Sequence, residues 1–208
     1  MSEIIIVSLT TFFAVIGPID VAVVFAALTT KNTQREKRAM AARGVVIGTI
    51  ILLLFAFAGN PLLSYMGISL AALRVGGGIL LLLVAIDMVF ARSSGSTSTT
   101  DEEEEEAQAR DDISVFPLAT PLIAGPGAIG AVILLMADTA GDPLQIALVL
   151  GPLLVLLFGT WLLLLIATRV DRLLGVTGLQ VVSRVFGILL AALSVQFIFD
   201  GLAQSGLF

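Results

Sequence analysis

The chain has 208 residues, of which 58% are hydrophobic and 13% are charged, with a mean hydropathy of +1.07 and a formal net charge of −5. A soluble domain has about a quarter of its residues charged, so this composition excludes a soluble globular protein and predicts an integral membrane protein. The absence of cysteine and histidine excludes disulfides, thiol nucleophiles and the usual zinc sites.

Six apolar stretches follow one another along the chain, and each is long enough to cross a membrane. About 20 helical residues span the ~30 Å hydrocarbon core. The stretches are roughly Ile4–Leu28, Gly44–Ser64, Leu70–Phe90, Ile113–Ala137, Leu144–Ala167 and Arg184–Leu202. The first lacks a basic start, so it is interpreted as a retained helix and not as a signal peptide. The expected fold class is an all-α membrane protein with six transmembrane helices.

The first stretch contains Gly17-Pro18-Ile19-Asp20 near its middle. Proline lacks a backbone donor and collides with the preceding helical turn, and glycine weakens the helix further. A helix restarting at Pro18 would point free N–H groups and the positive end of its dipole toward mid-membrane. An anionic group such as an amino-acid carboxylate fits there. A simple proline kink is the alternative interpretation.

Asp20 directly follows this break, and a carboxylate inside a bilayer is costly enough to suggest a function. It is expected to bind a coupling cation, to carry a proton or to meet the ammonium group of a substrate. Two structural interpretations stay open: Asp20 pairs with Arg74, or it lies in a hydrated vestibule.

Two further residues are candidates for a supporting role. Arg74, at the start of the third stretch, is the only basic residue expected on the outer side, so it pairs with a carboxylate, attracts anions or serves as an interfacial anchor. Gln196, in the last stretch, faces a cavity or forms a hydrogen bond between helices. Gly44 and Gly48 form a GxxxG pattern, which predicts close helix packing.

Residues 93–112 read SSGSTSTTDEEEEEAQARDD and have no apolar face to bury. They predict a disordered, acidic cytoplasmic linker. This linker divides the chain into a first three-helix repeat, residues 1–92, and a second three-helix repeat, residues 113–208.

The fourth stretch carries Pro117, Pro121 and Pro126 within ten residues, with Gly125 and Gly127 beside the last of them. Continuous helix is not expected through this segment. Non-helical backbone at membrane depth is tolerated only where protein or a water-filled cavity satisfies it. The segment is therefore interpreted as a second break that leaves room for a ligand, in preference to a kink.

The two halves repeat their features at nearly one offset. Gly125-Pro126 follows Gly17-Pro18 by 108 positions. Arg184-Val185 follows Arg74-Val75 by 110 positions. Because each half has an odd number of spans, the second half must be inverted relative to the first. Inverted repeats whose helices break at matching positions are typical of secondary transporters.

The basic residues predict the orientation, because loops rich in lysine and arginine stay in the cytoplasm. These residues gather in or beside the loops after the first, third and fifth stretches: Lys31, Arg35, Lys37, Arg38, Arg43, Arg92, Arg110, Arg169, Arg172 and Arg184. The chain is therefore expected in the cytoplasmic membrane with both termini outside.

Three segments resemble the MarC family of membrane proteins. They are GISLAALRVGGGILLLLVAIDM at residues 67–88, PLATPLIAGPGAI at residues 117–129 and SRVFGILLAALSVQFIFDGL at residues 183–202. The resemblance covers nearly the whole chain apart from the linker. It implies six helices in two inverted halves and a transporter of small neutral amino acids such as glycine and alanine.

The chain departs from the family pattern at the first break. The family commonly has Asn-Pro-Ile-Gly with a further proline three residues later, where this chain has Gly17, Pro18, Ile19, Asp20 and Val23. The loss of the asparagine amide and the gain of a carboxylate leave a cationic or differently coupled substrate open.

The sequence thus predicts a secondary transporter of small neutral amino acids, with the substrate at half-helix N-termini near mid-membrane. The expected site consists of Gly17, Pro18, Asp20, Gly125, Pro126 and Gly127. A non-transporting scaffold and a transporter of a cation or another small solute are the alternatives. An enzyme is not expected, because no nucleophile or acid–base motif is present. No metal or cofactor is expected beyond a coupling H⁺ or Na⁺. The expected partners are the bilayer and a small molecule, without nucleic acid, and a homo-oligomer stays open.

Overall fold

The computed structural model describes residues 2–90 and 112–206, and for residues 168–180, 182 and 183 it describes only the backbone. All regular elements in this described part are helices. They are α1 (Ser2–Ile16), α2 (Pro18–Leu28), α3 (Gln34–Tyr65), α4 (Leu70–Phe90), η1 (Ser114–Ile123), α6 (Pro126–Ala137), α7 (Pro143–Leu165) and α8 (Ala167–Gln204). The predicted linker, residues 93–112, lies outside the described residues except for Asp112.

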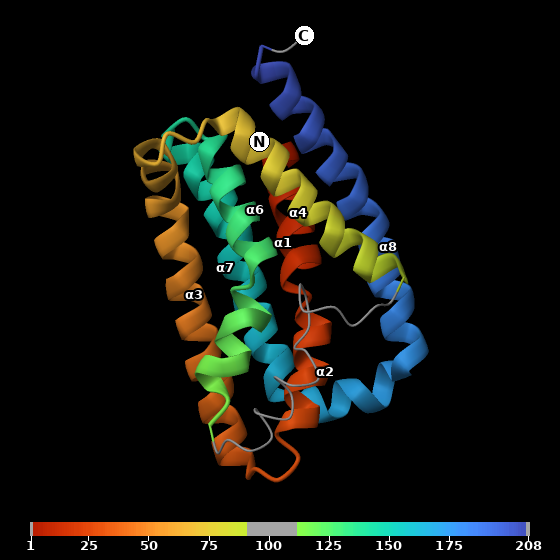
Figure 1. Ribbon diagram of the computed structural model, residues 1–208. Helices are drawn as coiled ribbons and strands as arrows, with labels where there is room; N and C mark the ends of the chain where they lie inside the picture. Colours follow the sequence, from red (N-terminus) through yellow and green to blue (C-terminus); the bar gives the residue numbers. More distant parts are fainter. Residues whose placement is uncertain (1, 91–111, 207–208) are drawn as a thin grey trace.

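Five helical stretches are long and apolar enough to cross a membrane: Ser2–Leu28, Gln34–Tyr65, Leu70–Phe90, Pro143–Leu165 and Arg184–Gln204. The pair η1 and α6, bent by 54° at its break, gives a sixth when it is counted as one span. Successive spans run in alternating directions, so α1 begins and α8 ends at the same end of the bundle (Figure 1). The expected all-helical membrane protein is confirmed at this level.

Two helices extend well beyond their predicted apolar stretches. α3 begins at Gln34 instead of Gly44, because Thr33 and Glu36 form a reciprocal cap at its start. The Thr33 N–H donates to the Glu36 carboxylate at 2.7 Å, and the Glu36 N–H donates to the Thr33 hydroxyl at 3.4 Å. Likewise, α8 begins at Ala167 and not at Arg184. Both helices therefore begin several turns before their apolar stretches, while the candidate membrane span within α8 begins at Arg184 as expected.

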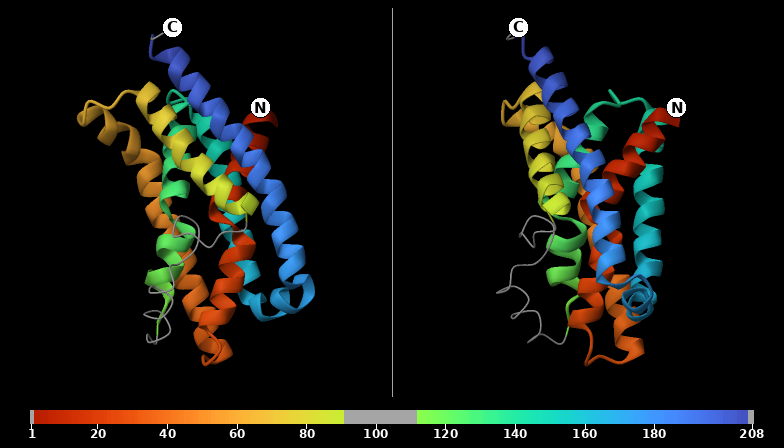
Figure 2. Two further views of the ribbon diagram at one scale, coloured as in Figure 1. Left: turned by 45° about the vertical axis from the view of Figure 1, so that its right-hand side comes forward. Right: turned by 90° about the vertical axis from the view of Figure 1, so that its right-hand side faces the viewer.

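The broken first span lies at the centre of the bundle. In Ser2–Leu28, 56% of the most apolar window is buried, against 39% or less in each of the other four spans. Most of α6 is buried as well. Around them, α3 packs against η1, α6 and α7, while α7 packs against α1 and α2. On another flank α4 and α8 lie side by side, as both views in Figure 2 show.

Glycines set the contact between α4 and α8. A Cβ atom added to Gly78 would lie 2.8 Å from the carbonyl oxygen of Ser194. A Cβ atom added to Gly187 would lie 3.1 Å from the carbonyl oxygen of Ala85. The two backbones therefore approach closely at two points, where a larger residue would push them apart.

The GxxxG pattern of α3 also mediates packing. A Cβ atom on Gly44 would lie 2.4 Å from Leu118, and one on Gly48 would lie 2.7 Å from Ile123. Both partners belong to η1, so these glycines seat α3 against the irregular part of the fourth span.

Asp112 fastens the start of η1. Its carboxylate accepts hydrogen bonds from the Ser114 N–H at 2.9 Å and from the Arg43 guanidinium of α3 at 2.5 Å. The bonds from Ser114, with a smaller contribution from Arg43, hold the pKa of Asp112 below its usual value. Both side chains of the ion pair are largely exposed, at 58% for Arg43 and 44% for Asp112, so the pair contributes little to stability.

The contact between α4 and α8 gives a first prediction. Replacing Gly78 or Gly187 with alanine should lower the free energy of unfolding of the detergent-solubilised protein by about 1–3 kcal/mol, because the added methyl group meets a backbone carbonyl. Gly76→Ala is the matched control, since a Cβ atom there has nothing within 4 Å. That variant should be neutral or slightly stabilised through helix propensity. Thermal melting followed by size-exclusion chromatography measures all three, and equal melting temperatures would contradict the packing role.

Candidate functional site

The first span breaks at Gly17, whose φ of 56° lies in the left-handed region that glycine adopts without strain. The Gly17 N–H closes α1 by donating to the Phe13 carbonyl at 3.0 Å. α2 then begins at Pro18, and its first helical bond runs from the Val21 N–H to the Gly17 carbonyl at 3.0 Å. No side chain caps this start, so the amides of the first turn are available to a ligand.

The fourth span breaks over a longer segment. η1 is a wide, irregular helix in which Phe116 and Thr120 have extended backbone angles, and it ends at Ile123. α6 begins at Pro126 after Gly125, again without a side-chain cap. A Cβ atom on Gly125 would lie 2.5 Å from the Pro121 carbonyl oxygen, so only glycine fits at this position. The irregular backbone thus covers the whole segment that holds Pro117 and Pro121, and it begins three residues before Pro117.

The structure brings parts of the two breaks together. A Cβ atom on Gly127 would lie 3.9 Å from Val15, in the last turn of α1, and 3.4 Å from Val84 of α4. These are ordinary contact distances, so the first turn of α6 lies directly beside the end of α1. Gly125 and Gly127 are buried, whereas Pro126 is exposed.

Asp20 occupies the first turn of α2, and its side chain folds back toward the break. Its Oδ2 atom lies 3.1 Å from the position that a Cβ atom of Gly17 would take. As a whole residue, Asp20 is exposed in the described structure. An acidic group in the first turn interacts favourably with the helix dipole.

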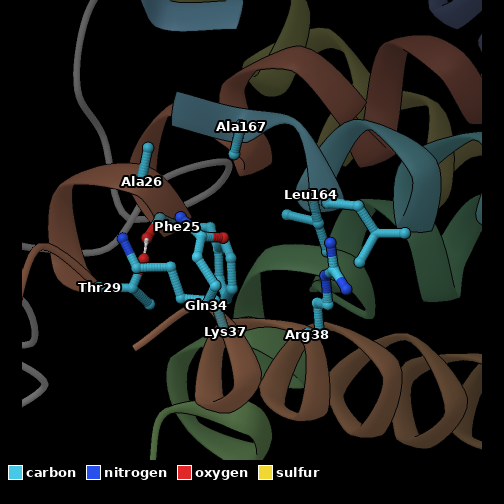
Figure 3. A pocket seen from close by; sticks show the side chains of 9 residues that line it. Phe25, Ala26, Thr29, Gln34, Lys37, Arg38, Leu164 and Ala167 are labelled. Atoms are coloured by element: carbon cyan, nitrogen blue, oxygen red, sulfur yellow. Dashed lines mark hydrogen bonds between the residues drawn. The ribbon is translucent and has the colours of Figure 1, made fainter. Parts of the chain in front are cut away.

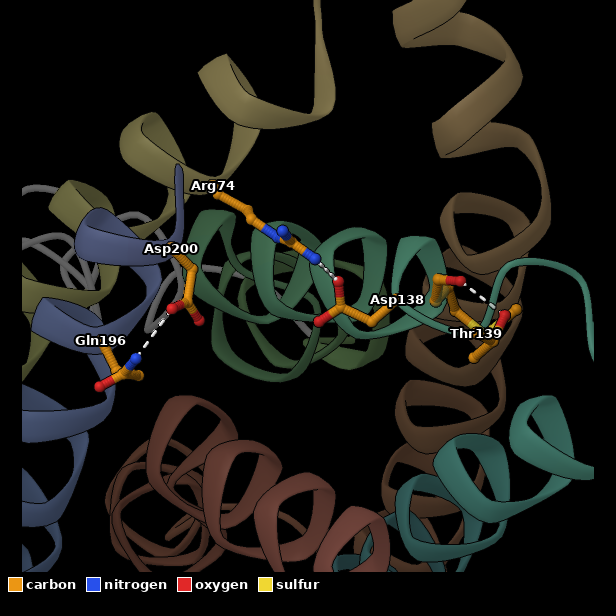
Figure 4. A network of polar contacts seen from close by, with 6 residues as sticks. Arg74, Asp138, Thr139, Gln196 and Asp200 are labelled. Carbon is orange, nitrogen blue, oxygen red and sulfur yellow. Dashed lines mark hydrogen bonds and ion pairs between the residues drawn. The ribbon is translucent and has the colours of Figure 1, made fainter. Parts of the chain in front are cut away.

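Neither candidate supporting residue contacts the breaks. Arg74 forms an ion pair with Asp138, just after α6, and so the predicted alternative of an Arg74–Asp20 pair is wrong (Figure 4). The Arg74 side chain is only 13% exposed and that of Asp138 is 38% exposed. Gln196 is exposed and donates to Asp200 in its own helix at 2.8 Å, which corrects the expected bond between helices.

Sequence reasoning missed two hydroxyl groups in the interior. Ser8 and Thr11 of α1 are fully buried, and neither hydroxyl has a hydrogen-bond partner among the described residues. Their spacing places them on one face of the helix, before the break. The signal available in the sequence was the presence of two polar residues, three positions apart, within an apolar membrane span. Unpaired buried hydroxyls are costly, so this face is a further place where a ligand or ion would be stabilised.

A metal centre of the usual acidic type is not formed here, since no three of the described His, Cys, Asp and Glu side chains lie together.

Comparison with known proteins places the chain among membrane proteins. Residues 2–205 match the family model described as MarC family integral membrane protein. The chain is 37% identical to a UPF0056 membrane protein of Methanocaldococcus jannaschii over 197 residues, which cover 95% of each chain. It is 34% identical to a relative of the same description from Archaeoglobus fulgidus, over 95% of this chain and 91% of the relative. No solved structure matches the chain. The family resemblance inferred from the three sequence segments is thereby confirmed.

The Arg74–Asp138 pair gives a second prediction. Arg74→Gln should cost about 1–3 kcal/mol of stability, because Asp138 loses a charged hydrogen-bond partner beside a largely buried guanidinium. Arg43→Gln, which breaks the exposed pair with Asp112, should cost less than about 1 kcal/mol. Melting temperatures of the purified variants measure the difference. A double-mutant cycle with Asp138→Asn isolates the pair, and zero coupling between the two substitutions would show that the contact has no energetic role.

Proposed function

This chain belongs to the MarC family of integral membrane proteins, and on that premise we propose that it is a secondary transporter of small neutral amino acids, glycine- or alanine-like. The observation that carries the proposal is the pair of uncapped helix starts at Gly17-Pro18 and Gly125-Pro126 inside the bundle. A substrate bound there meets two helix dipoles and a set of backbone N–H groups without a competing side-chain cap.

The charges suggest how a zwitterion would be oriented. The start of α2 already has the Asp20 carboxylate beside it, so the start of α6 is the better place for a second carboxylate. The N–H groups of Gly127 and Ala128 would donate to the carboxylate of the substrate, and Asp20 would accept from its ammonium group. Both α6 residues are buried and small, which favours glycine or alanine over larger amino acids.

The contact between α4 and α8 supports two inverted three-helix repeats, residues 1–92 and 113–208. Gly78 and Gly187 are 109 positions apart, and so are their carbonyl partners Ala85 and Ser194. Gly78 therefore touches α8 at the position equivalent to the one at which Gly187 touches α4. Because the two helices run in opposite directions, this reciprocal contact is what a two-fold axis in the membrane plane produces.

Most of the other helix contacts also recur when each helix is replaced by its equivalent in the other half. α3 packs against η1 and α6, as α7 packs against α1 and α2. α4 packs against α6, as α8 packs against α2. α1 packs against α6, as η1 packs against α2. The pairs α3 with α7 and α4 with α8 each join equivalent helices of the two halves. Transport would then proceed by movement of one repeat against the other around the breaks.

One ion pair lies toward each end of the bundle: one joins the first half to the second, and the other joins the first half to the last residue of the linker. Arg74 of α4 pairs with Asp138 after α6, and Arg43 of α3 pairs with Asp112 before η1. Alternating access requires that one end open while the other stays closed. We assign these pairs as the contacts that open and close in turn.

Orientation and coupling belong to the same proposal. The basic turn between α2 and α3 lies at the end opposite the start of α1, so both termini would be outside the cytoplasmic membrane. The coupling ion would be H⁺ carried by Asp20, or Na⁺ held by oxygen atoms such as the unpaired hydroxyls of Ser8 and Thr11.

A cation transporter is the second candidate, favoured by the Asp20 carboxylate at the break. A scaffold would explain the glycine contacts of α3, α4 and α8, but it gives no role to uncapped helix starts in the interior.

The helix start of α6 gives a third prediction. Gly127→Val should abolish the uptake of radiolabelled glycine and alanine into proteoliposomes, because its methyl groups fill the space over the first N–H groups. Gly130→Val, one turn later in the same helix, should retain uptake, since a Cβ atom there has nothing within 4 Å. Equal uptake by both variants would remove the proposed site. If the wild-type protein moves no amino acid under a sodium or proton gradient, the substrate assignment is wrong.

Asp20 gives a fourth prediction. Asp20→Asn should alter which gradient drives uptake, or its pH dependence, because the change removes an ionisable group at membrane depth. Asp200→Asn is the control, since Asp200 bonds Gln196 within α8 and lies away from both breaks. Uptake measured across pH values with imposed gradients tests the pair. An unchanged pH and ion dependence in Asp20→Asn would assign the carboxylate a structural role.

A further inference from the structure

A small pocket, with room inside it for about one water molecule, lies where the end of α2 and the end of α7 meet the start of α3 (Figure 3). It lies at the basic end of the bundle, and none of the six expected site residues lines it. The lining residues are Phe25, Ala26, Thr29, Gln34, Lys37, Arg38, Leu164, Leu165 and Ala167. Three of these, all from the first turns of α3, combine two positive charges with an amide.

The cavity is positively charged and has no carboxylate in its lining. Lys37 and Arg38 form no ion pair with a described residue. The acid on the same turn, Glu36, is held by Thr33 in the helix cap and lines a different surface depression together with Arg35. Among the described residues, no carboxylate therefore neutralises these two charges.

A second, separate depression is an apolar groove between α3 and α7. Its lining residues are Ala42, Val45, Val46 and Thr49 of α3 with Leu154, Leu157, Phe158 and Trp161 of α7. On each helix the groove residues follow the pocket residue at intervals of three or four positions, starting from Arg38 on α3 and from Leu164 on α7. Residues at these intervals lie on the same face of a helix. Cavity and groove therefore share one face of the bundle.

The groove has the length and position of a lipid chain. From Arg38 to Thr49 the helix rises about 16 Å, close to half of the ~30 Å hydrocarbon core and so to one leaflet. Trp161 lies one turn from the pocket residue Leu164, and tryptophan is enriched at membrane interfaces. Val46 and Phe158 are more than half exposed, so the groove opens toward the bilayer.

We propose that this cavity and groove form a binding site for one anionic phospholipid. Its phosphate lies at Lys37 and Arg38, and one of its chains lies along the groove between α3 and α7. Charge complementarity selects an anionic head group, because a lipid near two basic side chains gains from each of them. The groove explains why a lipid is preferred to a free phosphate ion. The site is separate from the proposed transport site and does not depend on transport.

The test compares two double variants of equal charge. Delipidated protein in detergent is titrated with phosphatidylglycerol, and binding is measured by native mass spectrometry. Lys37→Gln/Arg38→Gln should weaken binding about 30-fold, at roughly a few-fold per basic residue near a membrane surface. Lys31→Gln/Arg35→Gln removes one lysine and one arginine from the same end but outside the cavity lining, and it should change binding less than about 3-fold.

Three outcomes would overturn the proposal. Equal losses in the two double variants would show diffuse attraction and no site. Equal affinity of the wild type for phosphatidylcholine and phosphatidylglycerol would show that the head-group charge does not contribute to binding. Displacement of the lipid by millimolar inorganic phosphate would make the cavity a site for the free ion.

The chain-binding part of the site has its own test. Ala42→Phe fills the groove next to the cavity and leaves both basic residues in place. It should weaken binding of long-chain phosphatidylglycerol several-fold more than binding of the dihexanoyl form, whose chains do not reach along the groove. An equal effect on the two lipids would restrict the site to the head group.

Discussion

Inside a hydrocarbon layer no water is available to bond a free peptide group, so a helix that breaks at that depth must be enclosed by protein. The arrangement of this bundle follows from that constraint. The two broken spans lie in the interior, and α3, α4, α7 and α8 surround them. Glycines on three of these outer helices allow the close approach that the enclosure requires. The irregular backbone is thus tolerated because the regular helices cover it.

Local signals in the sequence predicted the local structure well. α4 spans Leu70–Phe90 as predicted, because an apolar run of membrane length has turn residues on its N-terminal side. The early start of α3 was also predictable, since Thr33 and Glu36 have the spacing of a capping box. The apolar run by itself begins only at Gly44, so a prediction based on that run misses the first turns of the helix. The extended angles at Phe116 and Thr120 were also predictable, because each residue precedes a proline, whose ring disfavours helical angles in the residue before it.

Contacts between distant segments could not be predicted in the same way. The pair of Arg74 with Asp138 joins residues 64 positions apart, and several carboxylates were equally plausible partners from the sequence. At the candidate site, the dipeptides Gly17-Pro18 and Gly125-Pro126 mark where helices end. They carry no information on the approach of Gly127 to Val15 or on the burial of Ser8 and Thr11, which arise only when the helices assemble.

The two ion pairs toward the ends of the bundle differ in their exposure to the solution, and ionic strength would therefore act on them unequally. The side chains of Arg43 and Asp112 are 58% and 44% exposed, whereas that of Arg74 is only 13% exposed. Electrostatic attraction in water is screened over about 8 Å at physiological salt and about 3 Å at 1 M, while partly buried charges are screened much less. Concentrated salt would thus weaken the pair of Arg43 with Asp112 more than the pair of Arg74 with Asp138, so the balance between the two contacts depends on the ionic medium.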